Sequence, residues 1–448
     1  MDCLPLLPDG VADSALAYRN GCPVGRDALL GDVLALADRL PQTAHALNVC
    51  RDRYWFAVAL LAAICRDACT HLPSSTAPES IAGLCAELPE VVCLGDQAQP
   101  PTTSVPYVRV SEHATGPAVA APHIPRIRGN RAVVTVFTSG STGRPRPHRK
   151  TFARLLQNAR AEASIMWDAA GGRCSVVGTV PSQHMYGLES TILLPLFGGG
   201  RLSSRVPFFP TDICQALAEM PPPRLLVTTP FHLRKLLDSG VDIPSVAAVV
   251  SSTAPLPPAL GEEVEARLRA PLIEIYGSTE TGQLATRRPT AQVEWDAYAG
   301  ITLTQADGRT MADGGHLEQE YPLNDTVELL GPARFRLLGR NSDMVNIAGK
   351  RSSLGYLNHI LTSVPGVRDG AFCVPPQKSV GDISRLVAFV VAPQLGSKQI
   401  LTALRAHIDP VFLPRPVIFV DRLPRNETGK IPVTAMDALI ALHLPHRA

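Results

Sequence analysis

The stretch Thr138-Ser139-Gly140-Ser141-Thr142-Gly143 follows the apolar, β-branched run of residues 133–137 and leads into Arg144-Pro145-Arg146. A strand that ends in a loop of glycines and small hydroxylated residues is typical of phosphate binding. Glycine lets backbone N–H groups approach an anion closely, and Ser and Thr hydroxyls add donors. The loop has neither the Walker A pattern nor the G-x-G-x-x-G pattern of dinucleotide sites. It therefore predicts a nucleotide site of another kind, with an ordinary surface turn as the alternative.

Three further motifs follow along the chain. They are Tyr276-Gly277-Ser278-Thr279-Glu280-Thr281-Gly282, Gly339-Arg340-Asn341-Ser342-Asp343 and Leu423-Pro424-Arg425-Asn426-Glu427-Thr428-Gly429-Lys430-Ile431-Pro432. Together with the first loop, and in this order, they resemble the core motifs of the adenylate-forming superfamily. That superfamily contains acyl-CoA synthetases, luciferases, aryl-acid ligases and the adenylation domains of peptide synthetases. The resemblance extends from about residue 133 to the C-terminus.

The resemblance implies that the chain binds ATP and Mg²⁺ and transfers AMP to a carboxylic acid. The Thr138 loop is expected to hold the β- and γ-phosphates, and Glu280 to hold Mg²⁺. Tyr276 is expected to stack on adenine, Asp325 to bind the ribose hydroxyls, and Arg340 to bind ribose or phosphate. The family motifs place further residues around the nucleotide: Thr253, Ala254, Pro255, Gly277, Ser278 and Thr279. The alternatives are a helix-start acid for Glu280, a turn residue for Asp325 and a core aromatic for Tyr276.

Lys430 and His184 are the remaining candidate catalytic residues, beside Arg340. A carboxylate that attacks the α-phosphate is already ionised at neutral pH, so the reaction needs positioning and charge neutralisation. A flexible ammonium can bridge the two anions, and the resemblance assigns this role to Lys430. His184 aligns with a family segment that lines the acyl pocket, where an aromatic ring gates access of the acceptor thiol. A structural core histidine is the alternative.

Several positions depart from the family pattern. Asn324 precedes Asp325 where glycine is usual, and Ser252 and Thr253 also stand at glycine positions. Arg146-Pro147 replaces the usual Lys-Gly after the phosphate loop, which keeps the charge. Ser342 occupies the hinge position, where Asp or Lys is common, so the resemblance does not extend to the details of domain rotation.

Composition excludes several classes of protein. The chain has 448 residues, a net charge of +2 and 18% charged residues, which gives no electrostatic case for binding nucleic acid or a membrane surface. Ten cysteines without a C-x-x-C pair indicate neither a zinc site nor a disulfide framework. The N-terminus does not resemble a signal peptide, and the apolar run of residues 55–65 is too short to span a bilayer. We therefore expect a cytoplasmic protein without a membrane span.

The pattern of apolar runs predicts an α/β fold. From residue 131, β-branched runs alternate with helical patterns, as in residues 175–180, 225–229, 247–250 and 272–276, which favours a largely parallel sheet in a layered domain. Residues 25–95 are predicted to be mainly helical. We expect residues 1–340 to form a large adenylation domain. Residues 341–448 then form a small, mobile α+β domain that carries the lysine loop.

The acid pocket favours an aryl or acyl carboxylic acid over an amino acid, and the resemblance implies an aryl acid. Amino-acid activators need a carboxylate near the start of the acid pocket, and residues 182–188 contain none, although Glu189 follows directly. The closest resemblance is to ligases that load 3- or 4-hydroxybenzoate onto an acyl carrier protein, as in aryl-polyene or xanthomonadin pigment synthesis. That implies the phosphopantetheine thiol of a carrier protein as acceptor. The alternatives are an aryl- or fatty-acyl-CoA ligase that uses free coenzyme A, and a non-catalytic nucleotide-binding homologue.

Overall fold

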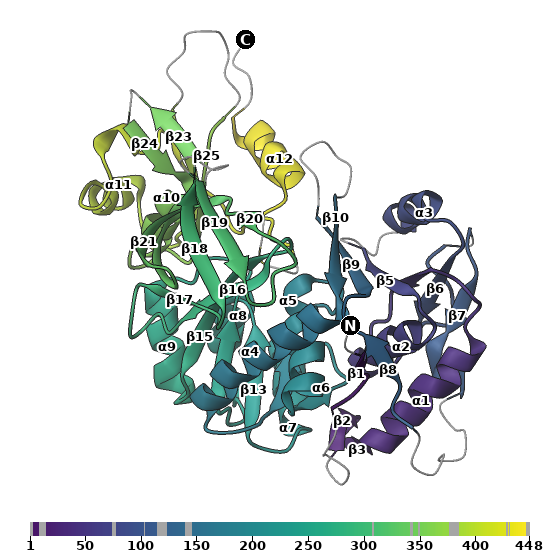
Figure 1. The fold of residues 1–448 in the computed structure, drawn as a ribbon. Coiled ribbons are helices and arrows are strands. Elements are labelled where there is room, and N and C mark those ends of the chain that lie inside the picture. The colour runs from purple at the N-terminus through teal and green to yellow at the C-terminus, as the bar shows by residue number, and fades with distance from the viewer. Residues whose placement is uncertain are drawn as a thin grey trace.

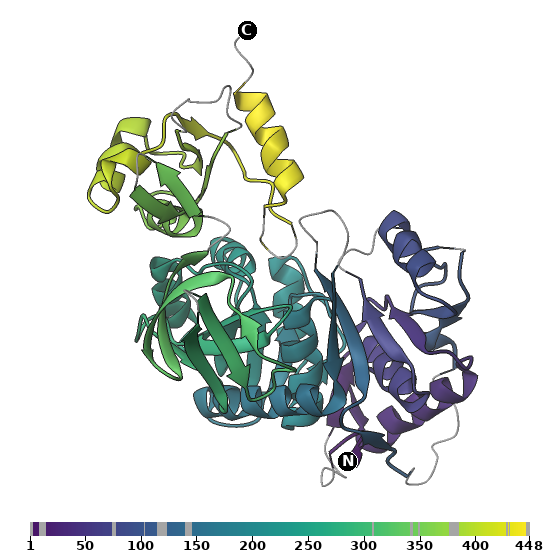
Figure 2. The ribbon, with the colours of Figure 1, turned by 45° about the horizontal axis from the view of Figure 1, so that its top comes forward.

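The computed structural model describes residues 3–8, 15–73, 78–102, 104–113, 123–138, 146–306, 309–340, 344–347, 350–375, 385–426, 429 and 431–444. The fold is mixed α/β, with a large N-terminal domain and a smaller C-terminal domain, as predicted (Figures 1 and 2). In Figure 2 the smaller domain, which carries the C-terminal helix, is the separate body at the top of the view. The domain boundary at 340/341 stays a prediction, because residues 341–343 lie outside the described residues.

An eleven-stranded sheet forms the centre of the large domain. Its order is β21 (Asp325–Gly331), β22 (Arg334–Arg340), β17 (Trp295–Ala297), β16 (Gly282–Arg287), β15 (Leu272–Ser278), β14 (Ala248–Ser251), β13 (Arg224–Thr228), β11 (Ser175–Gly178), β12 (Arg201–Ser203), β2 (Ala15–Arg19) and β3 (Cys22–Gly25). The strands from β15 through β2 pair in parallel, and the others pair antiparallel. The predicted strands at residues 175, 225, 247 and 272 are therefore confirmed as the parallel part of this sheet.

A second sheet of six strands lies beside it. Its order is β10 (Arg146–Thr151), β9 (Ala132–Thr138), β5 (Cys69–Leu72), β4 (His45–Asn48), β6 (Val91–Gly95) and β7 (Tyr107–Arg109). Only the β9–β10 pair is antiparallel. The prediction that residues 25–95 are mainly helical is thus wrong in part. Short apolar runs between the helices form β4, β5 and β6, a case in which periodicity alone does not separate strand from helix.

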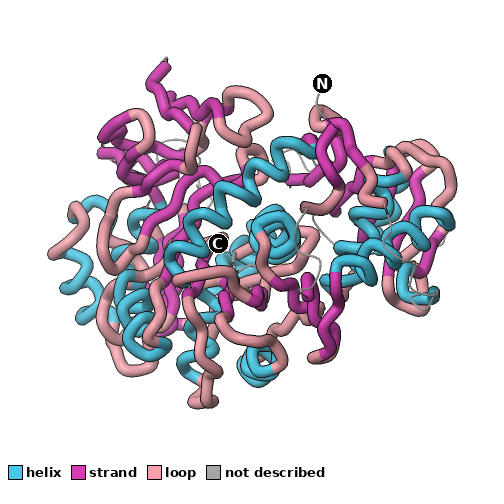
Figure 3. Tube along the Cα trace, turned by 60° about the horizontal axis from the view of Figure 1, so that its bottom comes forward, coloured by secondary structure: helices cyan, strands magenta, loops and turns pink. Residues whose placement is uncertain are grey.

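Helices cover the two sheets, and helices and strands mix throughout the molecule (Figure 3). The helices of the large domain are α1 (Arg26–Arg39), α2 (Arg53–Cys65), α3 (Pro78–Glu87), α4 (Phe152–Ala170), α5 (Met185–Leu188), α6 (Leu194–Gly198), α7 (Pro210–Ala218), α8 (Pro230–Asp238) and α9 (Pro258–Leu268). A π-helical turn, Glu189–Leu193, joins α5 to α6. The short elements are two 3-10 turns (Val110–His113, Pro410–Phe412), β1 (Cys3–Pro5) paired with β8 (Arg126–Arg128), and the sheet of β18 (Ile301–Ala306), β19 (Arg309–Gly314) and β20 (Tyr321–Pro322).

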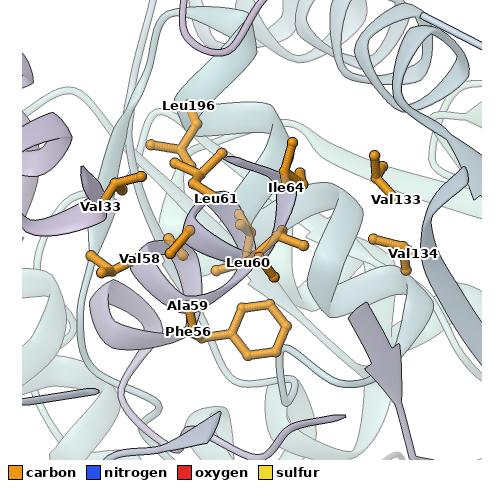
Figure 4. Packing of buried hydrophobic residues seen from close by; sticks show 14 of the residues in the cluster. Val33, Phe56, Val58, Ala59, Leu60, Leu61, Ile64, Val133, Val134 and Leu196 are labelled. Carbon is orange, nitrogen blue, oxygen red and sulfur yellow. The ribbon is translucent and has the colours of Figure 1, made fainter. Parts of the chain in front are cut away.

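The apolar helix α2 lies at the centre of the largest core cluster. From Arg53 to Ile64 every residue is buried, so α2 has no exposed polar face. Figure 4 shows its side chains, among them Phe56, Leu60 and Ile64, packed between residues of α1, β9 and α6. This arrangement confirms the predicted core helix. The strand β9, which leads to the phosphate loop, is therefore anchored in the core. Of the helices that the structure describes, none combines the length and apolar character required to cross a membrane.

The smaller domain is built on a three-stranded sheet of β25 (Asp369–Cys373), β26 (Val387–Val391) and β27 (Val417–Phe419). Its other elements are β23 (Met344–Ile347), β24 (Lys350–Ser353), α10 (Leu354–Thr362), α11 (Ser397–Arg405) and α12 (Val433–His443). Helices α10 and α11 share one apolar cluster with the sheet, and α12 packs into another through Ile440 and Met436. The segment that leads into α12 carries the predicted lysine motif.

Candidate nucleotide and acid site

Most of the predicted site residues that the structure describes line one cleft. The cleft has a volume of about 2290 Å³ and takes its walls from both domains. The predicted residues along it are His184, Thr253, Ala254, Pro255, Tyr276, Gly277, Ser278, Thr279 and Asp325. Several of them lie at the end of β15 or follow β11 and β14, so they gather where parallel strands end, the usual ligand edge of an open α/β sheet.

Tyr276 and Asp325 are joined directly. The Tyr276 hydroxyl donates to Asp325 Oδ2 at 2.6 Å, from β15 to β21. The Tyr276 ring lies 5.6 Å from the Trp295 ring and 5.5 Å from the Phe335 ring, measured between centroids. An aromatic wall and a carboxylate thus stand side by side, a pairing suited to a base and its sugar. Arg340 lies opposite Asp325 on β22, as its backbone partner, and its side chain is outside the described residues.

The segment around Thr253 has an unusual backbone. Thr253 has a φ of 80°, in the left-handed region where glycine is favoured. The expected glycine position therefore keeps a glycine-like conformation although threonine occupies it. The segment continues to Leu256, whose N–H donates to the buried carboxylate of Glu274 at 3.2 Å. Glu274 pairs with Arg287 at 2.7 Å; burial raises its pKa, and the Arg287 charge opposes that rise.

The turn after β15 brings Glu280 close to the cleft. Gly277 lies against the backbone of Gly282, so a side chain at position 277 would collide with it. Glu280 is half-buried, and its carbonyl accepts a hydrogen bond of 2.5 Å from Lys150 Nζ on β10. Lys150 is only 5% exposed. A buried ammonium therefore ties the Glu280 turn to the strand that returns from the phosphate loop.

The phosphate loop connects two paired strands. Thr138 ends β9 and pairs with Arg146 at the start of β10. The predicted phosphate-binding residues Ser139, Gly140, Ser141, Thr142 and Gly143 lie outside the described residues, as does the side chain of Thr138. Their role stays a prediction, but the ends of the loop are set by the β9–β10 pairing.

His184 begins the segment that forms another wall of the cleft. Its Nδ1 accepts a hydrogen bond from the Tyr186 N–H at 3.3 Å and so caps α5. The Tyr186 hydroxyl donates toward the carbonyls of Thr228 and Val250, at 3.1 Å each. Val180, just upstream, accepts from the fully buried Arg53 at 2.6 Å. Hydrogen bonds therefore hold this wall on both sides of His184, at Val180 and at Tyr186.

The smaller domain places the lysine motif at the cleft. Arg425 forms a two-pronged pair with Asp369, with N–O distances of 2.7 and 2.9 Å. Its third donor reaches the carbonyl of Gly429 at 2.8 Å. Gly429 is buried, has a φ of 78° and lies against Phe231 of α8 in the large domain. Lys430 is outside the described residues, but its neighbour is fixed where the two domains meet.

The residues present fit a nucleotide with a magnesium ion. Among the described residues, no group of three or more His, Cys, Asp or Glu side chains forms a ready-made metal site. Mg²⁺ usually binds through one or two carboxylates together with substrate phosphates and water, so a single acid such as Glu280 is sufficient. The aromatic and carboxylate pair of Tyr276 and Asp325 fits the nucleoside.

Sequence reasoning missed the parts of the site that depend on tertiary contacts. The buried Lys150, the Glu274–Arg287 pair and the Arg425 contact to Gly429 were not predicted. Glu189 follows the predicted acid-pocket segment in the sequence, and in the structure it lines the cleft. A basic residue within the β-strand pattern after the loop was the one available signal for Lys150.

Comparison with known proteins agrees with this site. The AMP-binding enzyme family matches residues 36–309, and the AMP-binding enzyme C-terminal domain matches residues 357–430. The chain is 32% identical over 310 residues to a 4-coumarate–CoA ligase of Rhodobacter capsulatus, covering 68% of this chain and 76% of that protein. It is 23% identical over 404 residues to a 3-hydroxybenzoate–CoA/4-hydroxybenzoate–CoA ligase of Thauera aromatica, covering 79% and 74%.

Solved structures show the same fold. ATP-bound MatB from Rhodopseudomonas palustris superposes with a TM-score of 0.76 at 19% identity, covering 92% of each chain. The motifs, the cleft and the family matches lead to one conclusion: the chain belongs to the AMP-binding enzyme family, the adenylate-forming enzymes, and is an AMP-forming acid–thiol ligase that uses ATP and Mg²⁺.

Proposed function

We propose that this enzyme activates an aryl carboxylic acid as its acyl-adenylate, releases pyrophosphate, and then transfers the acyl group to the thiol of coenzyme A. The observation that carries the proposal is the single cleft that joins Tyr276, Asp325 and the acid-pocket segment of His184 to the lysine motif of the smaller domain. Both substrates of the first step can meet there. The named CoA ligases among the relatives support the reaction class.

In this proposal the first step needs no general base. The acid is ionised at neutral pH, and the obstacle is the approach of one anion to another. Lys430 bridges the carboxylate and the α-phosphate, and Arg340 adds a fixed fork of donors beside Asp325. Residues 138–143 would hold the β- and γ-phosphates, and Glu280 would hold Mg²⁺, whose charge would offset that of the triphosphate.

The nucleoside contacts and the thiol path complete the assignment. Tyr276 stacks on the base and Asp325 accepts hydrogen bonds from the ribose hydroxyls. The Thr253-Ala254-Pro255 segment and Gly277, Ser278 and Thr279 line the cleft, and in this proposal they surround the nucleotide. His184 stands on the acid-pocket wall, where its ring controls the approach of the thiol.

Coenzyme A is the proposed acceptor in preference to a carrier protein. The relatives reported above are named as CoA ligases, and one of them acts on hydroxybenzoates. The narrower hypothesis from sequence, a 3- or 4-hydroxybenzoate–acyl carrier protein ligase of pigment synthesis, has the aryl acid in common with these relatives. Its carrier-protein acceptor has no counterpart among them, and for this reason CoA takes its place.

The test separates the two half-reactions. Acid-dependent ATP–pyrophosphate exchange is measured with hydroxybenzoates, benzoate, 4-coumarate, fatty acids and amino acids, each at the same concentration. Thioester formation is then measured with CoA and, separately, with a phosphopantetheinylated carrier protein. Exchange with aryl acids and thioester on CoA are expected. Thioester on the carrier protein alone would restore the sequence-based hypothesis, and absence of exchange with every acid would refute the proposal.

A further inference from the structure

Glu189 places a carboxylate on the acid-pocket wall of the cleft. It is the first residue of the π-helical turn that follows α5, and it is only 2% exposed. Such turns are rare and often occur at functional sites. Figure 1 shows α5 beside β16, and these two elements are in contact. Glu189, Met185 and Tyr186 line the cleft together.

One oxygen of Glu189 is fixed by the large domain. Oε1 accepts a hydrogen bond from the Gln283 N–H at 3.4 Å and lies against Gly282. Gly282 has a φ of 71°, and a Cβ at this position would press into Oε1. The carboxylate is thus clamped to the start of β16. Among the described residues, none donates a hydrogen bond to its second oxygen.

Two neighbouring polar side chains, Gln283 and Tyr186, are already paired. The Gln283 side chain donates to Ser190 Oγ at 2.9 Å and accepts from the Tyr298 hydroxyl at 2.8 Å. The Tyr186 hydroxyl is engaged by two backbone carbonyls, so its ring presents only carbon to the cleft. A ligand in the cleft can supply a donor to the second oxygen of Glu189, and a hydrogen bond to this acceptor would contribute to binding.

Two charged groups act on Glu189, one from α4 and one from β10. Burial and the Glu162 carboxyl of α4 raise its pKa, and the Lys150 ammonium of β10 opposes the rise. The Lys150 ammonium donates a hydrogen bond to the Glu280 carbonyl. Its effect on Glu189 is electrostatic. A carboxyl group accepts a hydrogen bond in either protonation state, so its acceptor role does not depend on the pH.

We propose that Glu189 selects arenecarboxylic acids that carry a hydroxyl or amino substituent, by accepting a hydrogen bond from that substituent. The inference rests on the proposed function and names the class of acid within it. An apolar ring fits against Met185, Tyr186 and Gly282. A hydroxyl or amino group on that ring donates to the second carboxylate oxygen of Glu189, Oε2.

The experiment compares matched acids in ATP–pyrophosphate exchange. Purified full-length enzyme is assayed with 3- and 4-hydroxybenzoate, 3- and 4-aminobenzoate and benzoate. Glu189→Leu removes the acceptor, Glu189→Gln keeps an oxygen acceptor, and Glu162→Gln neutralises a buried carboxyl that has its own partner, Ser190. In Glu189→Leu, kcat/KM for the best substituted acid is expected to fall roughly 10- to 100-fold, and the value for benzoate to stay within about threefold.

Glu189→Gln is expected to keep most of the preference, and Glu162→Gln all of it. A Glu189→Leu enzyme that loses the same factor with benzoate as with the substituted acids would overturn the inference, as would a wild-type preference for benzoate. Exchange only with amino acids or fatty acids would also overturn it, while leaving adenylate formation in place. If no acid supports exchange, the proposed function itself fails. Melting temperatures of all variants show whether each one folds.

Discussion

Replacing Glu162 tests how much the ionisation of one buried carboxyl group lowers the stability of the large domain. This residue of α4 is 0% exposed, and Ser190 Oγ donates to its Oε1 at 2.5 Å. Its Oε2 has no hydrogen-bond partner among the described residues. Burial raises the pKa of the carboxyl from its ordinary 4.5 to about 7. Glu162→Gln keeps the shape and the acceptor for Ser190, and it removes the ionisation.

The sign follows from proton binding. The folded state holds the proton up to about pH 7, whereas the unfolded chain releases it near pH 4.5, so the free energy of unfolding falls as the pH rises through this window. The difference of about 2.5 pKa units corresponds to about 3 kcal/mol. Above pH 7.5 the Gln variant is therefore expected to be more stable by about that amount, and near pH 4.5 the two proteins should be equal.

The assay is the apparent melting temperature of both proteins between pH 5 and pH 8. With an unfolding entropy of roughly 2 cal/mol/K per residue over a domain of about 340 residues, the variant should melt roughly 5 °C higher at pH 8. Buried His71, His232 and His316, whose pKa values burial lowers to about 4, give the opposite pH trend, but they are common to both proteins and cancel in the difference.

The exposed Glu320→Gln serves as the control for replacing a surface carboxylate by an amide. A difference between Glu162→Gln and the wild type that stays constant with pH, or a Gln variant that melts lower at pH 8, would refute the reasoning.

Three further predictions concern the proposed reaction. Lys430→Ala should lower adenylate formation by roughly 100-fold or more, because it removes a transition-state donor, and should spare thioester formation from supplied adenylate; near-normal pyrophosphate release would contradict its role. Glu280→Ala should raise the Mg²⁺ concentration needed for half-maximal exchange, because it removes the carboxylate assigned to the metal. The variant keeps the backbone carbonyl that Lys150 contacts, and an unchanged metal dependence would argue against the assignment. Arg425→Gln should slow adenylate formation roughly tenfold by releasing the Gly429 carbonyl, with little change in the thioester step, and an equal loss in both steps would indicate a purely structural role.

Much of the fold could be predicted from local patterns. The strand runs at residues 175, 225, 247 and 272 are apolar, β-branched and separated by helical stretches, and they form the parallel part of the large sheet. The prediction for residues 25–95 was less accurate, because β4, β5 and β6 are four or five residues long and gain their identity only by pairing with one another and with β9.

Local motifs likewise predicted only part of the candidate site. Tyr276 and Asp325 were assigned separately from their motifs, and the structure joins them by one hydrogen bond. The contact between Lys150 and Glu280 connects residues 130 positions apart, and its partner is a backbone carbonyl that no side-chain pattern reveals. The setting of Glu189 likewise depends on Gly282 and Gln283 from a distant strand. Local spacing carries no information about such partners.

The hydrogen bond between Tyr276 and Asp325 has a consequence for inhibitors of this enzyme. With the phenol tied to the carboxylate, a shift of either side chain moves the other, so the proposed base and ribose contacts form one recognition unit. Changes to the sugar of a nucleotide analogue should then alter the fit of its base, and the two modifications should have non-additive effects on affinity. An inhibitor series that optimises the two halves independently would misjudge their combination.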